Sequence, residues 1–158
     1  MSDFRVRPME ASDLEAASNL AGRLVRQHHA FDPERFIHLA SPERGYARYF
    51  ASELESDEVV LIVAERAGNV VGYVYARMEP RSYNDLRDAC GMIHDVYVDA
   101  AARTKGIGEA LVRDAMRRLA DKGAPRVVLF TAVQNEAAQR LFARLGFRTT
   151  MLELTREL

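Results

Sequence analysis

Cysteine, tryptophan and lysine are scarce in this chain of 158 residues, which has one cysteine, no tryptophan and only two lysines. The single cysteine, Cys90, excludes an internal disulfide and argues against a cysteine-based zinc site. The longest apolar run, residues 59–64, is far shorter than the roughly 20 residues that a membrane-spanning helix needs. Residues 1–7 carry charges and lack the apolar stretch of a signal peptide. These absences predict a cytoplasmic protein.

The net charge is also small, at −1. A chain without a global positive field has no electrostatic means of attracting nucleic acid or an anionic membrane surface. With 48% hydrophobic and 28% charged residues, the composition is typical of a globular protein, and the length is typical of one domain. We therefore expect a single domain over residues 1–158 with neither a nucleic-acid nor a membrane partner.

Hydrophobic periodicity predicts a mixed series of helices and strands. Apolar residues at helical spacing start at Leu14, and prolines at first-turn positions predict helices after Pro33 and Pro42. Further helices are expected over 107–119 and 135–145. Strands are expected over 4–7, 59–66, 70–77, 92–98, 126–133 and 147–154. This order predicts an α/β or α+β domain in which one central sheet carries helices on both faces.

A glycine turn joins the strand expected at 92–98 to the following helix. Gly106 and Gly108 stand in the opening turn, where glycine costs roughly 1 kcal/mol relative to alanine. A helix N-terminus offers backbone N–H groups to an anion, and Arg103 and Lys105 add positive charge, so a pyrophosphate site is reasonable. A plain tight turn explains the glycines equally well. The turn is neither a Walker A loop nor a dinucleotide fingerprint, because Leu111 stands where the third glycine would be.

Two motifs together resemble those of the GNAT acetyltransferases. The first is Asp95-Val-Tyr-Val98 followed by Arg103-x-x-Gly106-x-Gly108-x-Ala-Leu111. The second is Asn135-Glu-Ala-Ala-Gln-Arg-Leu-Phe142-Ala-Arg-Leu-Gly146-Phe147, at the separation expected in that family. The resemblance is strong over residues 59–147 and weak before them.

The resemblance implies a mixed, mostly antiparallel central sheet that splays open after the fourth strand, with acetyl-CoA as cosubstrate, no metal and a homodimer. Backbone groups near Val96 and Val98 would pair with the pantetheine amides, and a backbone N–H, that of Val96, would stabilise the oxyanion. Asn135 would bind pantetheine, although its side chain also suits a helix cap. The residues assigned to acetyl-CoA are Val96, Tyr97, Val98, Arg103, Thr104, Lys105, Gly106, Ile107, Gly108, Asn135, Ala138 and Phe142.

His94 and Asp95 occupy the place where many GNAT enzymes carry a glutamate that takes the proton of the amine. His94 suits a general base because histidine titrates near neutrality, but a hydrogen-bonded strand histidine is an equally good interpretation. In a regular strand Asp95 points to the other face of the sheet. There it would bind a cationic substrate or hold a neighbouring loop.

Phe142 departs from the family pattern, since many members have a tyrosine there whose hydroxyl protonates the departing thiolate. Replacement donors are Tyr73, Tyr75, Tyr97 and Cys90, and the sequence does not choose among them. A thiol with a pKa of about 8.5 leaves readily as thiolate near pH 7, so the reaction tolerates this loss.

Three histidines, His28, His29 and His38, lie in the early helical region without a cysteine nearby to complete a ligand set. We expect them at a helix end or in a pocket wall rather than at a metal.

The favoured hypothesis is an N-acetyltransferase that moves acetyl from acetyl-CoA to a primary amine of a small molecule, a lysine or a protein N-terminus. The first alternative is a non-catalytic acyl-CoA-binding or regulatory module, which Phe142 supports. A protein that binds another phosphate ligand is the second, and it leaves the motif at Asn135 unexplained.

Overall fold

The structure is a computed structural model that describes residues 2–103 and 105–158. The strands are β1 (Phe4–Pro8), β2 (Val59–Arg66), β3 (Asn69–Glu79), β4 (Cys90–Val98) and β5 (Val127–Leu129). The helices are α1 (Leu14–Phe31), α2 (Pro42–Glu53), α3 (Ile107–Asp121) and α4 (Glu136–Arg144). Two short 3-10 turns, Ala11–Asp13 and Ala100–Ala102, precede α1 and follow β4.

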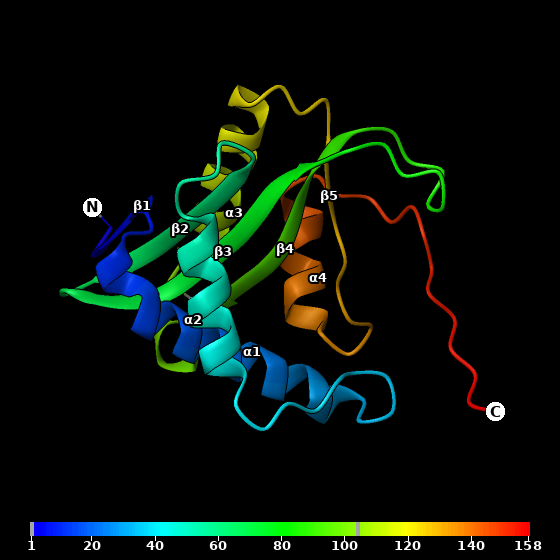
Figure 1. The fold of residues 1–158 in the computed structure, drawn as a ribbon, viewed down its shortest axis with the longest axis horizontal. Helices are drawn as coiled ribbons and strands as arrows, with labels where there is room; N and C mark the ends of the chain where they lie inside the picture. Colours follow the sequence, from blue (N-terminus) through cyan, green and yellow to red (C-terminus); the bar gives the residue numbers. More distant parts are fainter. Residues whose placement is uncertain (1, 104) are drawn as a thin grey trace.

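The strands form one sheet in the order β1-β2-β3-β4-β5 (Figure 1). β1 to β4 pair with one another antiparallel, and β5 runs parallel to β4. Only Gly91, Met92 and Ile93 of β4 pair with β5, so the rest of β4 has β3 on one side and no strand of the described chain on the other. The predicted mixed, mostly antiparallel sheet that splays after its fourth strand is therefore confirmed.

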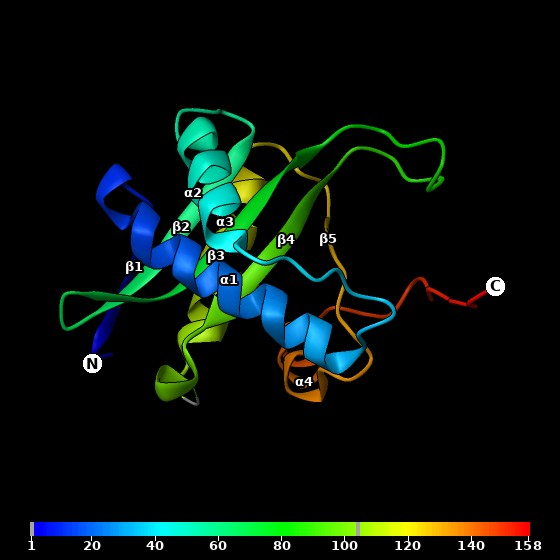
Figure 2. The same cartoon turned by 60° about the horizontal axis from the view of Figure 1, so that its bottom comes forward.

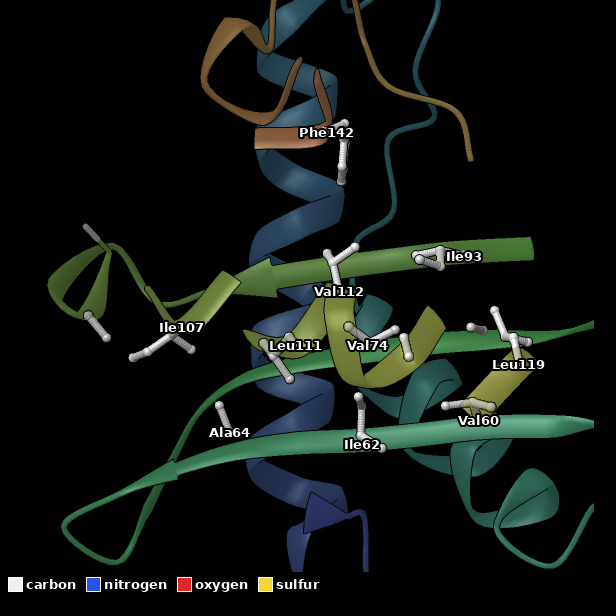
Figure 3. Close-up of a cluster of buried hydrophobic side chains, with 13 residues drawn as sticks. Val60, Ile62, Ala64, Val74, Ile93, Ile107, Leu111, Val112, Leu119 and Phe142 are labelled. Carbon is white, nitrogen blue, oxygen red and sulfur yellow. The ribbon is translucent and has the colours of Figure 1, made fainter. Parts of the chain in front are cut away.

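Helices cover both faces of this sheet, as predicted (Figure 2). On one face, α1 and α2 pack through a cluster that includes Leu20 and Phe50. On the other, α3 contributes Ile107, Leu111 and other residues to a cluster that Phe142 of α4 also joins (Figure 3). The alternation of side chains along the strands explains both clusters, since successive residues of β2 and β3 point to opposite faces. Among the described helices, none has the length and apolarity that a bilayer crossing requires.

The predicted hairpin at residues 67–69 is also confirmed. Ala67 and Gly68 both have positive φ angles, +49° and +79°, and they connect β2 to β3. Two successive residues of this kind match the twist of antiparallel strands, which is why glycine is favoured in such turns.

The helix predicted after Pro33 is wrong. The Asp32 carboxylate accepts hydrogen bonds from the backbone N–H groups of Glu34 and Arg35, and this closes a turn. Side chains of this kind compete with the helix for backbone groups, so the chain forms a turn there and continues without regular structure to α2.

Two predicted strands also differ from the structure. The strand predicted over 126–133 is limited to β5, because β4 diverges from it after Ile93. The strand predicted over 147–154 is wrong, since this segment belongs to no strand and residues 148–158 are all exposed. A strand needs a partner for its backbone groups, and none lies beside this segment within the described chain.

Candidate active site

The open side of β4 presents two backbone positions. Just beyond the end of β4, Asp99 donates its backbone N–H to the carbonyl of Val71. Backbone direction alternates along a strand, so the N–H and C=O groups of Tyr97 also point toward β3. The backbone N–H and C=O groups of Val96 and Val98 alternate with these groups and point toward the open side of β4. No strand of the described chain lies beside these backbone groups, although the Val98 carbonyl accepts a hydrogen bond from the Arg103 side chain.

The glycine turn lies at the C-terminal end of this open strand. Gly106 is the N-cap residue of α3 and has a φ of +79°, in the left-handed region where glycine carries no steric penalty. Arg103 donates from Nε to the carbonyl of Val98 at 3.0 Å, and its guanidinium lies over the Tyr97 ring at 5.2 Å. The first turn of α3, with its positive end, thus follows closely along the chain on the open part of β4. Thr104, also predicted to bind cofactor, lies outside the described residues.

Gly108 has a different role from Gly106. A Cβ atom built on Gly108 would lie 3.4 Å from Leu141 of α4 and 3.8 Å from Val98 of β4. Both are ordinary van der Waals distances, and they place Gly108 where α3, α4 and β4 converge. Ile107 beside it is buried and anchors this turn in the core.

The second motif forms α4. Asn135 caps the helix, as the alternative interpretation of this residue holds, by accepting a hydrogen bond from Ala138 N–H at 3.2 Å. Phe142 is 6% exposed and packs edge-on against Phe147 with ring centroids 5.8 Å apart. The aromatic side chain thus joins α4 to the core.

His94 sits where β4 leaves β5, at a β-bulge. The pairing of β3 with β4 passes from Tyr75–Asp95 to Ala76–Ile93, so His94 is the extra residue of β4. Its Nε2 lies 2.9 Å from Oε1 of Glu79, and its ring stacks on Tyr75 at a centroid distance of 5.3 Å. A carboxylate at Nε2 fixes the orientation of the imidazole and favours the tautomer with the proton on Nε2.

Asp95 does not point away from His94, contrary to the regular-strand prediction. Tyr73 donates its hydroxyl to Asp95 Oδ2 at 3.0 Å, while His94 stacks on Tyr75 of the same face of β3. The bulge is the cause, because an extra residue shifts the alternation of the strand. Burial raises the pKa of Asp95, and the Tyr73 hydrogen bond opposes that rise only in part.

Aromatic side chains from α2 and β3 surround these two residues. Tyr49 of α2 and Tyr75 of β3 join hydroxyl to hydroxyl at 2.6 Å, and Tyr46 lies on the same face. Burial raises the pKa of Tyr46, Tyr73 and Tyr75, with nearby Asp95 raising that of Tyr46 and Tyr73 further. The site thus combines one partly buried carboxylate with several neutral phenols.

The four predicted replacement acids differ in their surroundings. Tyr73 is fully buried and hydrogen-bonded to Asp95, and Tyr75 is engaged with Tyr49. Cys90 is buried at the start of β4, where Arg87 donates to its Sγ at 2.8 Å. Tyr97 is half-buried beneath Arg103, beside the glycine turn.

The three early histidines lie near the end of α1. His28 contacts Phe31 and Phe36 edge-on, and the rings of His29 and His38 are 5.1 Å apart. No cluster of three or more potential metal ligands occurs in the part of the chain that the structure describes.

The sequence analysis missed Glu79, Tyr46 and Tyr49. Glu79 reaches His94 only because the β3–β4 hairpin folds back and a bulge moves His94 in register. The tyrosines come from α2, far from the β4 motif in sequence. The only signal for them in the sequence was the presence of six tyrosines in a chain that has no tryptophan.

Comparisons with known proteins agree with this geometry. Residues 24–147 match the model of the Acetyltransferase (GNAT) family. A mycothiol acetyltransferase of Thermomonospora curvata is 33% identical over 91 residues, which are 58% of this chain but only 28% of that protein. An N-alpha-acetyltransferase of Sulfurisphaera tokodaii is 32% identical over 116 residues, or 70% of this chain and 69% of that protein. The chain thus spans less than a third of the mycothiol enzyme.

Solved structures share the fold over nearly the whole chain. An aminoglycoside N-acetyltransferase in complex with CoA superposes with a TM-score of 0.80 at 19% identity, covering 100% of this chain and 96% of that one. An acetyltransferase of Trypanosoma brucei gives a TM-score of 0.69 at 26% identity, with coverage of 99% and 100%. The matched model covers most of the chain, including the open strand, the glycine turn and α4. The chain therefore belongs to the GNAT family of acetyltransferases.

Proposed function

We propose that this protein transfers an acetyl group from acetyl-CoA to a primary amine by direct attack within a ternary complex, in the cytoplasm and without a metal. The amine belongs to a small molecule, a lysine side chain or a protein N-terminus. The observation that carries the proposal is the open half of β4, which has a glycine turn at one end and the His94–Glu79 pair at the other.

The residues present fit acetyl-CoA as cosubstrate. The first turn of α3, with Lys105 and Arg103 beside it, suits the pyrophosphate, because a helix N-terminus and two cations favour a dianion. The open backbone of Val96 and Val98 suits the amides of pantetheine. Asn135 at the start of α4 is proposed to bind pantetheine, because its Oδ1 caps the helix and its amide NH2 group can donate to a ligand.

His94 is proposed as the base. A free alkylamine is mostly protonated at pH 7, so a group in the site must take a proton before or during attack. With Glu79 holding Nε2–H, the imidazole presents Nδ1 as acceptor. In the overall step the bound ammonium gives one proton to His94, and the neutral amine nitrogen forms a bond to the acetyl carbon. The carbon–sulfur bond breaks, CoA leaves as the thiolate, and the thiolate takes up the second proton that the amide nitrogen loses. Glu79 acts through His94 and is a positioning residue.

Asp95 and the surrounding tyrosines are proposed to form the acceptor side of the site. A partly buried carboxylate beside aromatic faces attracts an ammonium group, both by charge and by cation–π contact. Asp95 binds the incoming cation in this proposal, and His94 next to it removes a proton. The aromatic walls favour an acceptor that carries apolar surface beside its amine.

The second candidate function is a non-catalytic acyl-CoA-binding module. The observation in its favour is Phe142, which has no proton to give and is packed into the core. Release of free thiol from acetyl-CoA, measured with a panel of small amines, lysine peptides and N-terminal peptides, separates the two. Amine-dependent release supports the enzyme, whereas tight binding of acetyl-CoA without release by any amine supports the module.

A further inference from the structure

Arg77 of β3 shares a face of its strand with Tyr75 and Glu79, the two side chains that contact His94. Its Nε atom is buried and has no hydrogen-bond partner among the residues that the structure describes. Two carboxylates lie beyond hydrogen-bond distance, with Oε1 of Glu79 3.6 Å from Nε and Oε2 of Glu53 3.7 Å from Nη1. A buried donor without a partner costs stability, and an apolar side chain of similar length would avoid that cost. Packing alone therefore does not explain a charge at this position.

A row of alternating charge leads from α2 to the proposed base. Glu53 of α2 is followed by Arg77 and then by Glu79, whose Oε1 lies 2.9 Å from Nε2 of His94. The four side chains are between 19% and 34% exposed, and charges that are partly buried are screened less than those on the surface. Arg77 and His94 thus face the same carboxylate oxygen of Glu79.

The Glu79 carboxylate that orients His94 also affects the charge of the imidazole. An anion beside an imidazole favours its protonated form, and a protonated imidazole accepts no further proton. A nearby cation has the opposite effect, because like charges repel each other. Arg77 suits this purpose because arginine keeps its charge at every relevant pH, and its hydrogen bond with Tyr75 raises its pKa further.

Other charged and titratable groups face the same part of the site. They are His28 from α1, Tyr46, Tyr49 and Glu53 from α2, Tyr73, Tyr75, Arg77 and Glu79 from β3, and Asp95 beside His94 on β4. Burial raises the pKa of Tyr46, Tyr73 and Tyr75, so these phenols stay neutral at pH 7. Arg77 is the one arginine or lysine in this group, and it opposes the carboxylates that favour a protonated His94.

We propose that Arg77 is a positioning residue whose charge keeps His94 neutral near pH 7 while Glu79 holds the imidazole in place. This inference rests on the proposed function, because it needs His94 as the base. Without the charge of Arg77, more of His94 is protonated near neutrality and less of it is able to accept the amine proton. In alkaline solution His94 is neutral with or without Arg77, so the loss of the charge has little effect there.

The first test compares Arg77→Gln with Arg66→Gln by steady-state thiol release at pH 6 and pH 9. Arg66 is the matched control, because its side chain is 31% exposed against 32% for Arg77 and lies at the other end of β2 from Val59, the partner of Arg77. A nearby charge shifts protonation by about one pH unit or more, so Arg77→Gln should lower kcat about tenfold at pH 6 and less than about twofold at pH 9. The ionisation of the amine is the same for every variant and cancels in these ratios.

Arg77→Lys and Arg66→Gln should follow the wild type at both pH values, because both keep a positive charge beside Glu79. Arg77→Met also removes the charge and carries the same prediction as Arg77→Gln, which it replaces if that variant does not fold. An equal loss at pH 6 and pH 9 would show that Arg77 only supports the fold, and it would overturn the proposal. A tenfold loss at pH 6 for Arg66→Gln would overturn it too.

The second test needs no reaction. Nuclear magnetic resonance of isotope-labelled histidine in the free protein distinguishes neutral imidazole from imidazolium, and His94→Ala identifies the signals of His94 among the four histidines. We expect His94 to lose its proton about one pH unit higher in Arg77→Gln than in the wild type, with no change in Arg77→Lys or Arg66→Gln. The absence of that shift would overturn the proposal. A shift in a protein that acetylates no amine would support the effect of Arg77 on His94 and contradict the proposed function alone.

Discussion

The Glu79–His94 contact yields a quantitative prediction for Glu79→Gln. A hydrogen bond to a charged group contributes about 1.5–3 kcal/mol. The two side chains are 23% and 34% exposed, so water reduces this to about 1 kcal/mol. If the contact acts by orienting the base, kcat should fall about fivefold with little change in the affinity for acetyl-CoA. His94→Ala should lower kcat by roughly 10²-fold or more, the scale of a lost general base.

A double-mutant cycle tests whether Glu79 acts through His94. Steady-state thiol release is measured for the wild type, both single variants and the combined variant. In the His94→Ala background, Glu79→Gln should change kcat by less than twofold, because no imidazole is left to orient. Glu79→Asp should recover part of the wild-type rate. A fivefold loss in both backgrounds would refute the positioning role, and near-normal rates for His94→Ala would refute the base.

Three further predictions concern the cofactor turn, the acceptor carboxylate and the fold. Gly108→Val should abolish acetyl-CoA binding in calorimetric titration, because its side chain would occupy the proposed position of the phosphate at the N-terminus of α3; undiminished affinity in a folded variant would contradict this. Burial raises the pKa of Asp95, so the wild type loses stability as pH rises through that pKa. Asp95→Asn should therefore raise Tm at neutral pH but not at pH 3, and should raise KM for the amine; a lower Tm at neutral pH would contradict it. Arg7 lowers the pKa of Asp13, so this pair stabilises the fold above the ordinary carboxyl pKa and is lost as pH falls through the lowered one. Asp13→Asn should lower the free energy of unfolding by about 1–3 kcal/mol at pH 7 and much less at pH 2, as denaturant titration will show.

The local patterns of the sequence predicted the fold well where one segment determines its own structure. The helix at α3, the β2–β3 hairpin and the cap at Asn135 each follow from periodicity or turn chemistry within a few residues. The splay of the sheet was instead predicted from the family resemblance. It depends on where β4 and β5 part, and no local pattern encodes that point.

The errors arise where a segment depends on a partner. The segment 147–154 has the composition of a strand, but it forms one only when backbone groups lie beside it. A different cause applies after Pro33, where a turn replaces the predicted helix because the Asp32 side chain competes for the backbone N–H groups. His94 and Asp95 were expected on opposite faces because a bulge comes from the pairing of two strands, and the sequence of β4 alone does not reveal it. Glu79 was missed for the same reason.

The most direct test of the proposed reaction is amine-dependent release of CoA from acetyl-CoA, with the acetylated amine quantified by mass spectrometry in the same sample. The proposed mechanism predicts one acetylated amine per thiol released by the wild type, and roughly 10²-fold slower formation of both products by His94→Ala. Tight binding of acetyl-CoA without an acetylated product from any amine of the panel would contradict it.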